Sequence, residues 1–141
     1  MDDLAVADTG TMGYYLALDS PCDNKQLAAN PLPIQMPNGE IFVSTHTALL
    51  SQQDLPIQAR KSHLFPGINK ALLSIGILCN RECQSTFDDN SVLILNKRSR
   101  KVIMKGTRDT CSNLYILNLI QRNNLLTEFI TTYGYFAGSA Y

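Results

Sequence analysis

The sequence predicts an all-β fold with one short helix, arranged as a small β-barrel or a sandwich. Short apolar segments recur along the chain and are separated by turn-forming residues, which is typical of the strands in such folds. One pair of these segments flanks Asn38-Gly39, the strongest short-range signal for a β-hairpin. No part of the chain alternates strand and helix patterns in the way that parallel βαβ units require.

Length and composition indicate one globular domain. The chain has 141 residues, close to the size of a single domain, and 45% of them are hydrophobic, enough to form a core. We place the β-domain at residues 1–119. Residues 120–141, which include the Gly- and Tyr-rich end of the chain, are interpreted as a C-terminal tail.

Charge and hydropathy exclude several classes of partner. Twelve Lys and Arg balance twelve Asp and Glu, so we expect no general attraction to nucleic acid. We interpret the basic segment 97–101 as a solvated hairpin tip rather than an RNA contact. No apolar run reaches the roughly 18–20 residues of a membrane helix, and the acidic start does not resemble a signal peptide. We therefore expect a cytoplasmic protein without a membrane partner.

The elements of the first half follow from local patterns. Residues 4–8 predict a strand that leads into a turn. Residues 20–31 are rich in structure breakers and predict a loop or a short helical turn. The arms on either side of Asn38-Gly39 predict a hairpin, whose tight turn needs positive φ at both central positions. The remaining elements of this half are a polar connector at 51–60 and a short apolar segment at 63–65.

The second half contains the most hydrophobic stretch of the chain. Residues 71–79 predict a buried strand that runs into a short helix. Residues 84–106 predict three strands, with turns at 88–90 and 97–100. Residues 113–119 suit a final strand, but the spacing of their leucines also suits a helix, so strand and helix both stay open for 113–132.

Near its start the chain reads VADTGTMG, and this is its one Asp-Thr-Gly triplet. Aspartic peptidases present a catalytic carboxylate in this way, after a short hydrophobic run, and their chemistry needs two such carboxylates. The closest imitations in the chain, at residues 19–21 and 109–111, both lack the glycine. Either the triplet at Asp8 is a chance turn, or the second aspartate comes from another copy of the chain.

The residues of the triplet suit that chemistry. Gly10 can give its N–H to the carboxylate of Asp8 without steric cost, and the hydroxyl of Thr9 can lock the loop. Two carboxylates within about 3 Å cannot both ionise, so they share one proton and titrate as a unit. One then takes a proton from the attacking water while its protonated partner donates toward the peptide carbonyl. We expect no metal, no cofactor and no covalent intermediate.

Other interpretations of these motifs are weaker. The letters DTGT also resemble the phosphate loop of actin-like and sugar-kinase ATPases, but that fold needs a second phosphate loop and a much longer chain. Cys79 and Cys83 form a CxxxC pair, yet zinc needs two more ligands. Neither His46 nor His63 lies close in the sequence to another residue that could bind zinc. We interpret the four cysteines as reduced thiols of a cytosolic protein.

An ordered set of segments resembles the retropepsin-like region of copia-type retrotransposon polyproteins. After the early DTG come MPNGEIFVSTHTALL, HLFPGINKALLSIGILC, STFDDNSVLIL and GTRDTCSNLYILNL, so the resemblance spans about residues 6–119. The block FPGINKALLSIG is its most specific part. The ordered set is far more specific than the triplet alone.

This resemblance implies roles for individual residues. Asp8 would be the catalytic aspartate, with Thr9 and Gly10 completing its loop. Ser74 stands where a glycine is expected if LLS takes the place of the family's hydrophobic-hydrophobic-Gly element. The resemblance implies a flap or substrate-binding role for Met36, Pro37, Asn38, Gly39 and Glu40, and active-site support by Leu72, Leu73, Ser74 and Gly76.

The resemblance also implies an assembly. The fold would be a closed β-barrel of retropepsin type, paired as a two-fold homodimer in which each chain supplies one Asp8. The substrate would be a polypeptide, namely cleavage sites of the polyprotein itself. The location would be the cytoplasm, including the interior of virus-like particles.

Some features depart from the family pattern. Seven residues precede Asp8, which is few for a dimerisation strand, and Thr11 and Met12 stand where smaller residues are common. No integrase zinc motif follows, so a fragment or a degenerate insertion is expected. Two hypotheses therefore stand: a dimeric aspartic endopeptidase, or a catalytically inactive β-barrel remnant or interaction domain of the same polyprotein.

Overall fold

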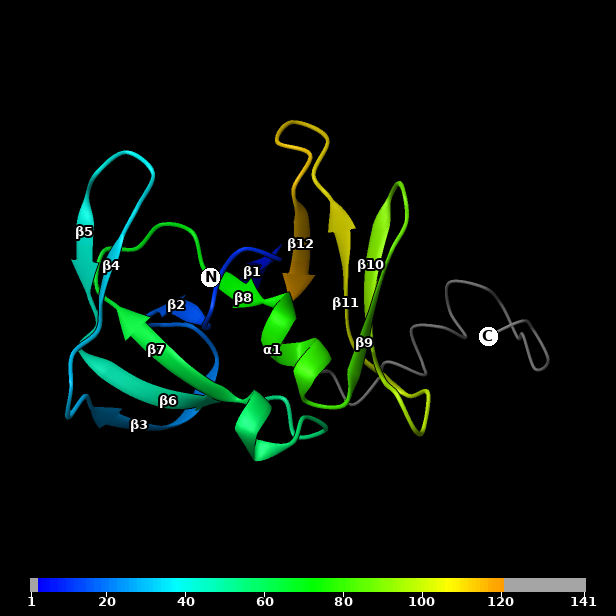
Figure 1. Cartoon of the computed structure of the whole chain (residues 1–141), viewed down its shortest axis with the longest axis horizontal. Coiled ribbons are helices and arrows are strands. Elements are labelled where there is room, and N and C mark those ends of the chain that lie inside the picture. The colour runs from blue at the N-terminus through cyan, green and yellow to red at the C-terminus, as the bar shows by residue number, and fades with distance from the viewer. Residues whose placement is uncertain (1–2, 121–141) are drawn as a thin grey trace.

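The computed structural model describes residues 3–120, which form short strands joined by turns, with one α-helix and one 3-10 helix in that range (Figure 1). The prediction of a mostly β fold with one short helix is confirmed. The strands are β1 (Leu4–Asp8), β2 (Tyr15–Ala17), β3 (Cys22–Leu27), β4 (Pro33–Gln35), β5 (Ile41–Val43), β6 (His46–Leu50), β7 (Lys61–Phe65), β8 (Leu72–Ser74), β9 (Cys83–Phe87), β10 (Ser91–Asn96), β11 (Val102–Arg108) and β12 (Tyr115–Asn118). The helices are η1 (Ile57–Ala59) and α1 (Ile75–Asn80).

Ten strands form one sheet in the order β3-β6-β7-β2-β8-β1-β12-β11-β10-β9, and β4 pairs with β5 in a separate hairpin. The predicted closed barrel is not found, because no pairing joins the outer strands β3 and β9 within the described residues. Strand β3 is built like a protected edge: its register shifts between Asp23 and Gln26, and Lys25 puts an exposed charge on it. Bulges and charges of this kind disfavour pairing with a further strand.

Strand β1 lies inside the sheet, parallel to β8 and antiparallel to β12. Both neighbours contribute leucines to one buried apolar cluster that draws on strands from either side of β1. Burial of each large member of such a cluster contributes about 1.5–3 kcal/mol. Strand β12 pairs with β1 from Leu4 to Val6, and β8 pairs with it from Val6 to Asp8, so the carboxyl end of β1 is held by β8. The largest fully buried members are Tyr14, Leu16, Leu50, Leu64, Leu73, Leu78, Ile94, Ile103, Leu117 and Leu119.

The predicted hairpin at Asn38-Gly39 forms between β4 and β5, but its turn differs from the expected one. Only Gly39 has a positive φ, at 91°; Asn38 does not. The N–H of Gly39 donates to the carbonyl of Met36 at 2.9 Å, and the N–H of Met36 donates to the carbonyl of Glu40 at 2.8 Å. This hairpin has a three-residue loop that ends in a glycine bulge, and such a loop needs only one residue with positive φ.

Tertiary pairing overrides two local interpretations. The segment predicted as a loop or helical turn at 20–31 contains strand β3, because β6 pairs with it despite its polar composition. The open choice at 113–119 is settled as strand β12, which pairs with both β1 and β11. Residues 121–132 of that choice lie outside the described residues. The strand-to-helix prediction for 71–79 and the three strands predicted within 84–106 are confirmed.

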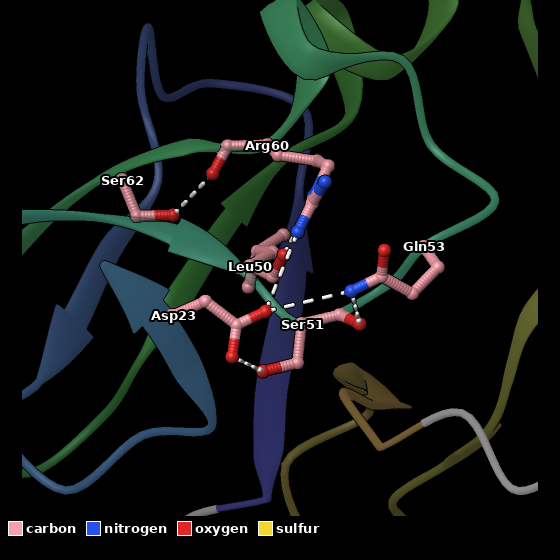
Figure 2. Close-up of polar contacts among 6 residues, drawn as sticks. All are labelled: Asp23, Leu50, Ser51, Gln53, Arg60 and Ser62. Carbon is pink, nitrogen blue, oxygen red and sulfur yellow. Dashed lines mark hydrogen bonds and ion pairs between the residues drawn. The ribbon is translucent and has the colours of Figure 1, made fainter. Parts of the chain in front are cut away.

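The connector between β6 and β7 is held by a mostly buried arginine (Figure 2). The side chain of Arg60 is 10% exposed; its Nε donates to the carbonyl of Leu50 at 2.7 Å, and its guanidinium lies 3.4 Å from Oδ2 of Asp23. Ser51 and Gln53 also donate to the Asp23 carboxylate. Because a buried charge is tolerated only when it is paired and hydrogen-bonded, the polar connector packs against β3 and β6.

Candidate active site

Asp8 is the last residue of strand β1, and its side chain is half-buried. Its Oδ1 accepts a hydrogen bond from the N–H of Gly10 at 2.7 Å, the bond that the Asp-Thr-Gly pattern predicts. Thr9 is exposed, and its hydroxyl makes no hydrogen bond within residues 3–120. The loop therefore fixes one carboxylate oxygen and leaves the Thr9 hydroxyl available to a second molecule.

Glycine at position 10 leaves space beside the Asp8 carboxylate and does not adopt an unusual backbone conformation. A Cβ at Gly10 would lie 3.3 Å from Oδ1 of Asp8, and the φ of Gly10 is not positive. A side chain here would push against the carboxylate that the same residue binds through its N–H. The size of residue 10 thus bears directly on the position of the Asp8 carboxylate.

Ser74 meets the Asp8 loop from strand β8. In the parallel pairing of β1 and β8, Ser74 lies opposite Asp8. Its Oγ donates to the carbonyl of Thr11 at 2.9 Å and accepts from the N–H of Ile77 at 3.1 Å, where it caps helix α1. Ser74 is 1% exposed, so both bonds are shielded from water.

The other residues of the expected supporting element are placed differently. Leu73 is fully buried in the core, and Leu72 is half-buried opposite Val6. Gly76 lies exposed in the first turn of α1, where an added Cβ would meet only Ser74 Oγ at an ordinary 3.7 Å. The structure thus brings Leu72, Leu73 and Ser74 to the strand that carries Asp8, whereas Gly76 faces away from the core.

The expected flap residues form the tip of the β4–β5 hairpin, which stands apart from the main sheet (Figure 1). Asn38 braces the tip: its Oδ1 accepts from the N–H of Glu40 and its Nδ2 donates to that side chain, both at 2.9 Å. Within residues 3–120, no hydrogen bond joins Met36, Pro37, Asn38, Gly39 or Glu40 to the Asp8 loop. Within these residues, the hairpin tip is thus not tied to the Asp8 loop by a hydrogen bond.

A second carboxylate does not meet Asp8 within the described part of the chain. Asp109, which begins the imitation triplet, lies in the turn between β11 and β12, where its carboxylate accepts from the N–H and hydroxyl of Ser112. Asp19 is exposed in the turn after β2. One chain therefore supplies one candidate catalytic carboxylate.

None of the four cysteines forms a disulfide bond in this structure, and two of them are set apart by their burial. All four are free, and burial raises the pKa of Cys22 and of Cys83 to about 11, so both are protonated and poor nucleophiles near neutral pH. In the described segment 3–120, no cluster of three or more His, Cys, Asp and Glu side chains is placed to hold a metal ion. No helix in that segment is long and apolar enough to cross a membrane.

Sequence reasoning missed two features. The hydroxyl of Ser74 acts on the loop, and a serine directly before an apolar helical run is a helix-capping signal that would have located it at the start of α1. A pocket of about 300 Å³ also opens beside the amino-terminal half of β1, and no pattern could have found it, because its walls come from four separate segments of the chain. Its lining includes Leu4, Val6, Ile68, Lys70, Asp109 and Leu114.

Comparison with known proteins adds no family to these observations. The sequence matches no protein-family model, and a search of curated proteins gave no significant match.

Proposed function

We propose that this protein is an aspartic endopeptidase of the retropepsin type, which works as a homodimer on polypeptide sites of a copia-type polyprotein. The observation that carries the proposal is the geometry at the end of β1. There, Asp8 is presented by an internal strand, its Oδ1 accepts from Gly10 at 2.7 Å, and Ser74 binds the far end of the same loop. Asp-Thr-Gly thus forms a braced loop rather than a free turn.

A second chain completes the proposed site. The Asp-Thr-Gly triplet occurs once in the sequence, and no other carboxylate meets Asp8 within residues 3–120. Thr9 and Gly10 are exposed, so two loops can approach across a two-fold axis, where each surface meets its own copy. In this proposal the chain adopts the retropepsin-type architecture and pairs with a second copy across a two-fold axis.

The chemistry follows from two carboxylates in one site. At about 3 Å separation the pair holds a single proton, because two charges so close cannot both form. The ionised member takes a proton from water as the water attacks the peptide carbonyl, and the protonated member donates to the carbonyl oxygen. The hairpin carrying Asn38 would close over the peptide and exclude water, which strengthens these interactions.

The test is cleavage of a peptide library by the full chain between about pH 4 and pH 7, the range in which shared carboxylates work. We expect activity from a species with twice the mass of the chain, and a loss of about 10³-fold or more in Asp8→Asn, because the shared proton and the base disappear. Asp109→Asn is the matched control, since it alters an Asp-Thr carboxylate already bound by its own turn. This control should cleave like the wild type.

The opposite result defines the alternative function. A folded monomer that cleaves nothing would make the chain a catalytically inactive β-domain of the same polyprotein. The observation behind that alternative is the sheet itself, in which no pairing joins the outer strands β3 and β9 within residues 3–120. Equal activity in wild type and Asp8→Asn would exclude the aspartic mechanism altogether.

A further inference from the structure

Ser74 links the Asp8 loop to helix α1 through one hydroxyl group. The Oγ donates its single proton to the carbonyl of Thr11 at 2.9 Å and accepts from the N–H of Ile77 at 3.1 Å. A serine hydroxyl has one donor, so these two bonds define the orientation of the group completely. A glycine, the residue that the family resemblance leads us to expect here, could make neither bond.

The same residue holds both ends of the loop. At one end, the backbone of Ser74 lies opposite Asp8 in the β1–β8 pairing. At the other end, its side chain binds the carbonyl of Thr11. The hydroxyl of Thr11 offers no second anchor, because its Oγ1 is buried and has no hydrogen-bond partner within the described residues. Ser74 therefore holds the loop at both Asp8 and Thr11.

The position of the Asp8 carboxylate depends on these two contacts of Ser74 with the loop. Gly10 lies between the two anchored ends, and its N–H sets the orientation of Asp8 Oδ1 at 2.7 Å. A shift of the loop would move this N–H and, with it, the carboxylate. Catalytic groups displaced by about 1 Å can lose on the order of a hundredfold in rate.

We propose that Ser74 is a positioning residue for the catalytic carboxylate: its hydroxyl fixes the loop that aims Asp8. This inference rests on the proposed peptidase function and extends it to a residue that touches no substrate. Ser74 is 1% exposed, so it acts from behind the loop rather than from the cleft.

The experiment compares Ser74→Ala with Ser74→Thr and Ser74→Cys in the full chain, using the peptide that the wild type cleaves best. Alanine removes the hydroxyl, threonine keeps it, and cysteine keeps the size but bonds weakly. Ser62→Ala is the matched control, because Ser62 is 2% exposed and its Oγ donates to the carbonyl of Arg60 at 2.9 Å, in a different part of the sheet. Each variant is measured for kcat, KM, pH profile and amide hydrogen exchange at residues 9–12.

We expect kcat of Ser74→Ala to fall about tenfold or more while KM stays within about twofold, because orientation rather than substrate binding is lost. The amides of residues 9–12 should exchange faster, and the acid and base limbs of the pH profile should move. Ser74→Thr should restore most of kcat. Ser62→Ala should keep the wild-type kcat and pH profile even where it loses stability.

Each result bears on one claim. If the wild type cleaves and Ser74→Ala matches Ser62→Ala in kcat and pH profile, the positioning role is wrong and the peptidase proposal stands. If the wild type cleaves nothing, the peptidase proposal fails, and with it the catalytic role of Ser74. If Ser74→Ala does not fold, Ser74→Cys decides, and a wild-type kcat in that variant overturns the inference. Unchanged exchange at residues 9–12 in Ser74→Ala also overturns it.

Discussion

Two turns of this molecule begin with Asp-Thr, and they treat the aspartate in opposite ways. Asp8 ends the internal strand β1, and its carboxylate accepts one backbone N–H, from Gly10, through Oδ1. Asp109 lies in the turn between β11 and β12, and its Oδ2 accepts both the N–H and the hydroxyl of Ser112, each at 2.7 Å. The Asp8 carboxylate thus accepts a single hydrogen bond from its turn, whereas the Asp109 carboxylate accepts two from Ser112.

The difference appears in the electrostatics of Asp109. The hydroxyl of Ser112, followed by its backbone N–H, lowers the pKa of the Asp109 carboxyl below its usual value, because hydrogen bonds to the charged form stabilise it. The corresponding residue three positions after Asp8 is Thr11, whose carbonyl is bound by Ser74 and whose hydroxyl is buried without a partner in the described residues. Within the described residues, Thr11 thus makes a tertiary contact through its carbonyl and, unlike Ser112, no side-chain hydrogen bond to the aspartate of its own turn.

The largest expected effect comes from breaking strand β12, which lies between the two regions. Gly106 of β11 pairs with Leu117 of β12, and a Cβ there would overlap the carbonyl of Ile116 and lie 2.8 Å from Cα of Leu117. Strand β12 cannot retreat freely, because its other edge pairs with β1. We expect Gly106→Ala to lower the free energy of unfolding by about 3 kcal/mol or more, measured by urea denaturation.

Gly76→Ala is the matched control for this prediction. A Cβ at Gly76 would make only an ordinary contact, and alanine favours a helix over glycine by up to about 1 kcal/mol. We expect its stability to be unchanged or slightly higher. Equal denaturation midpoints for Gly106→Ala and wild type would show that β12 can move away from the added Cβ despite its pairing with β1.

The second prediction replaces Gly10, the residue by which the Asp8 triplet differs from the Asp109 triplet. In Gly10→Ala, the added Cβ would press on Oδ1 of Asp8 from 3.3 Å. We expect peptide cleavage to fall by on the order of a hundredfold, while stability changes by less than about 1 kcal/mol at this exposed loop. Cys111→Ala, at the equivalent exposed position of the other turn, should leave both quantities unchanged. A fully active Gly10→Ala would show that Asp8 tolerates a displaced carboxylate.

The smallest effect concerns the titration of Asp109. Because its folded-state pKa lies below the unfolded value of about 3.8, Asp109 stabilises the fold above that pH, and this contribution is lost as the pH falls through the folded-state pKa. Asp109→Asn should therefore be slightly less stable than the wild type at pH 7 and indistinguishable from it near pH 2. Urea midpoints at the two pH values measure this. A difference that grows toward low pH would contradict the assigned role of Ser112.

Local signals predicted those parts of the molecule that depend on neighbours in the chain. The strand before Asp8, the hairpin at Asn38-Gly39 and the strand-to-helix segment at 71–79 all form where the sequence predicts them. The Gly10 bond to Asp8 spans two residues, so the triplet itself contains it. Strand β3 was missed because its polar side chains give no strand signal until β6 pairs with it.

By itself, the sequence determined a β-rich domain, the position of its hairpin and the presence of one Asp-Thr-Gly loop, because backbone preferences and short-range hydrogen bonds fix these features. Tertiary structure alone decided that β3 and β9 stay unpaired with each other within residues 3–120, that β8 lies parallel to β1 and that Ser74 reaches Thr11 across 63 positions of the chain. Such contacts follow from the packing of distant segments around a shared core. No local pattern encodes that packing.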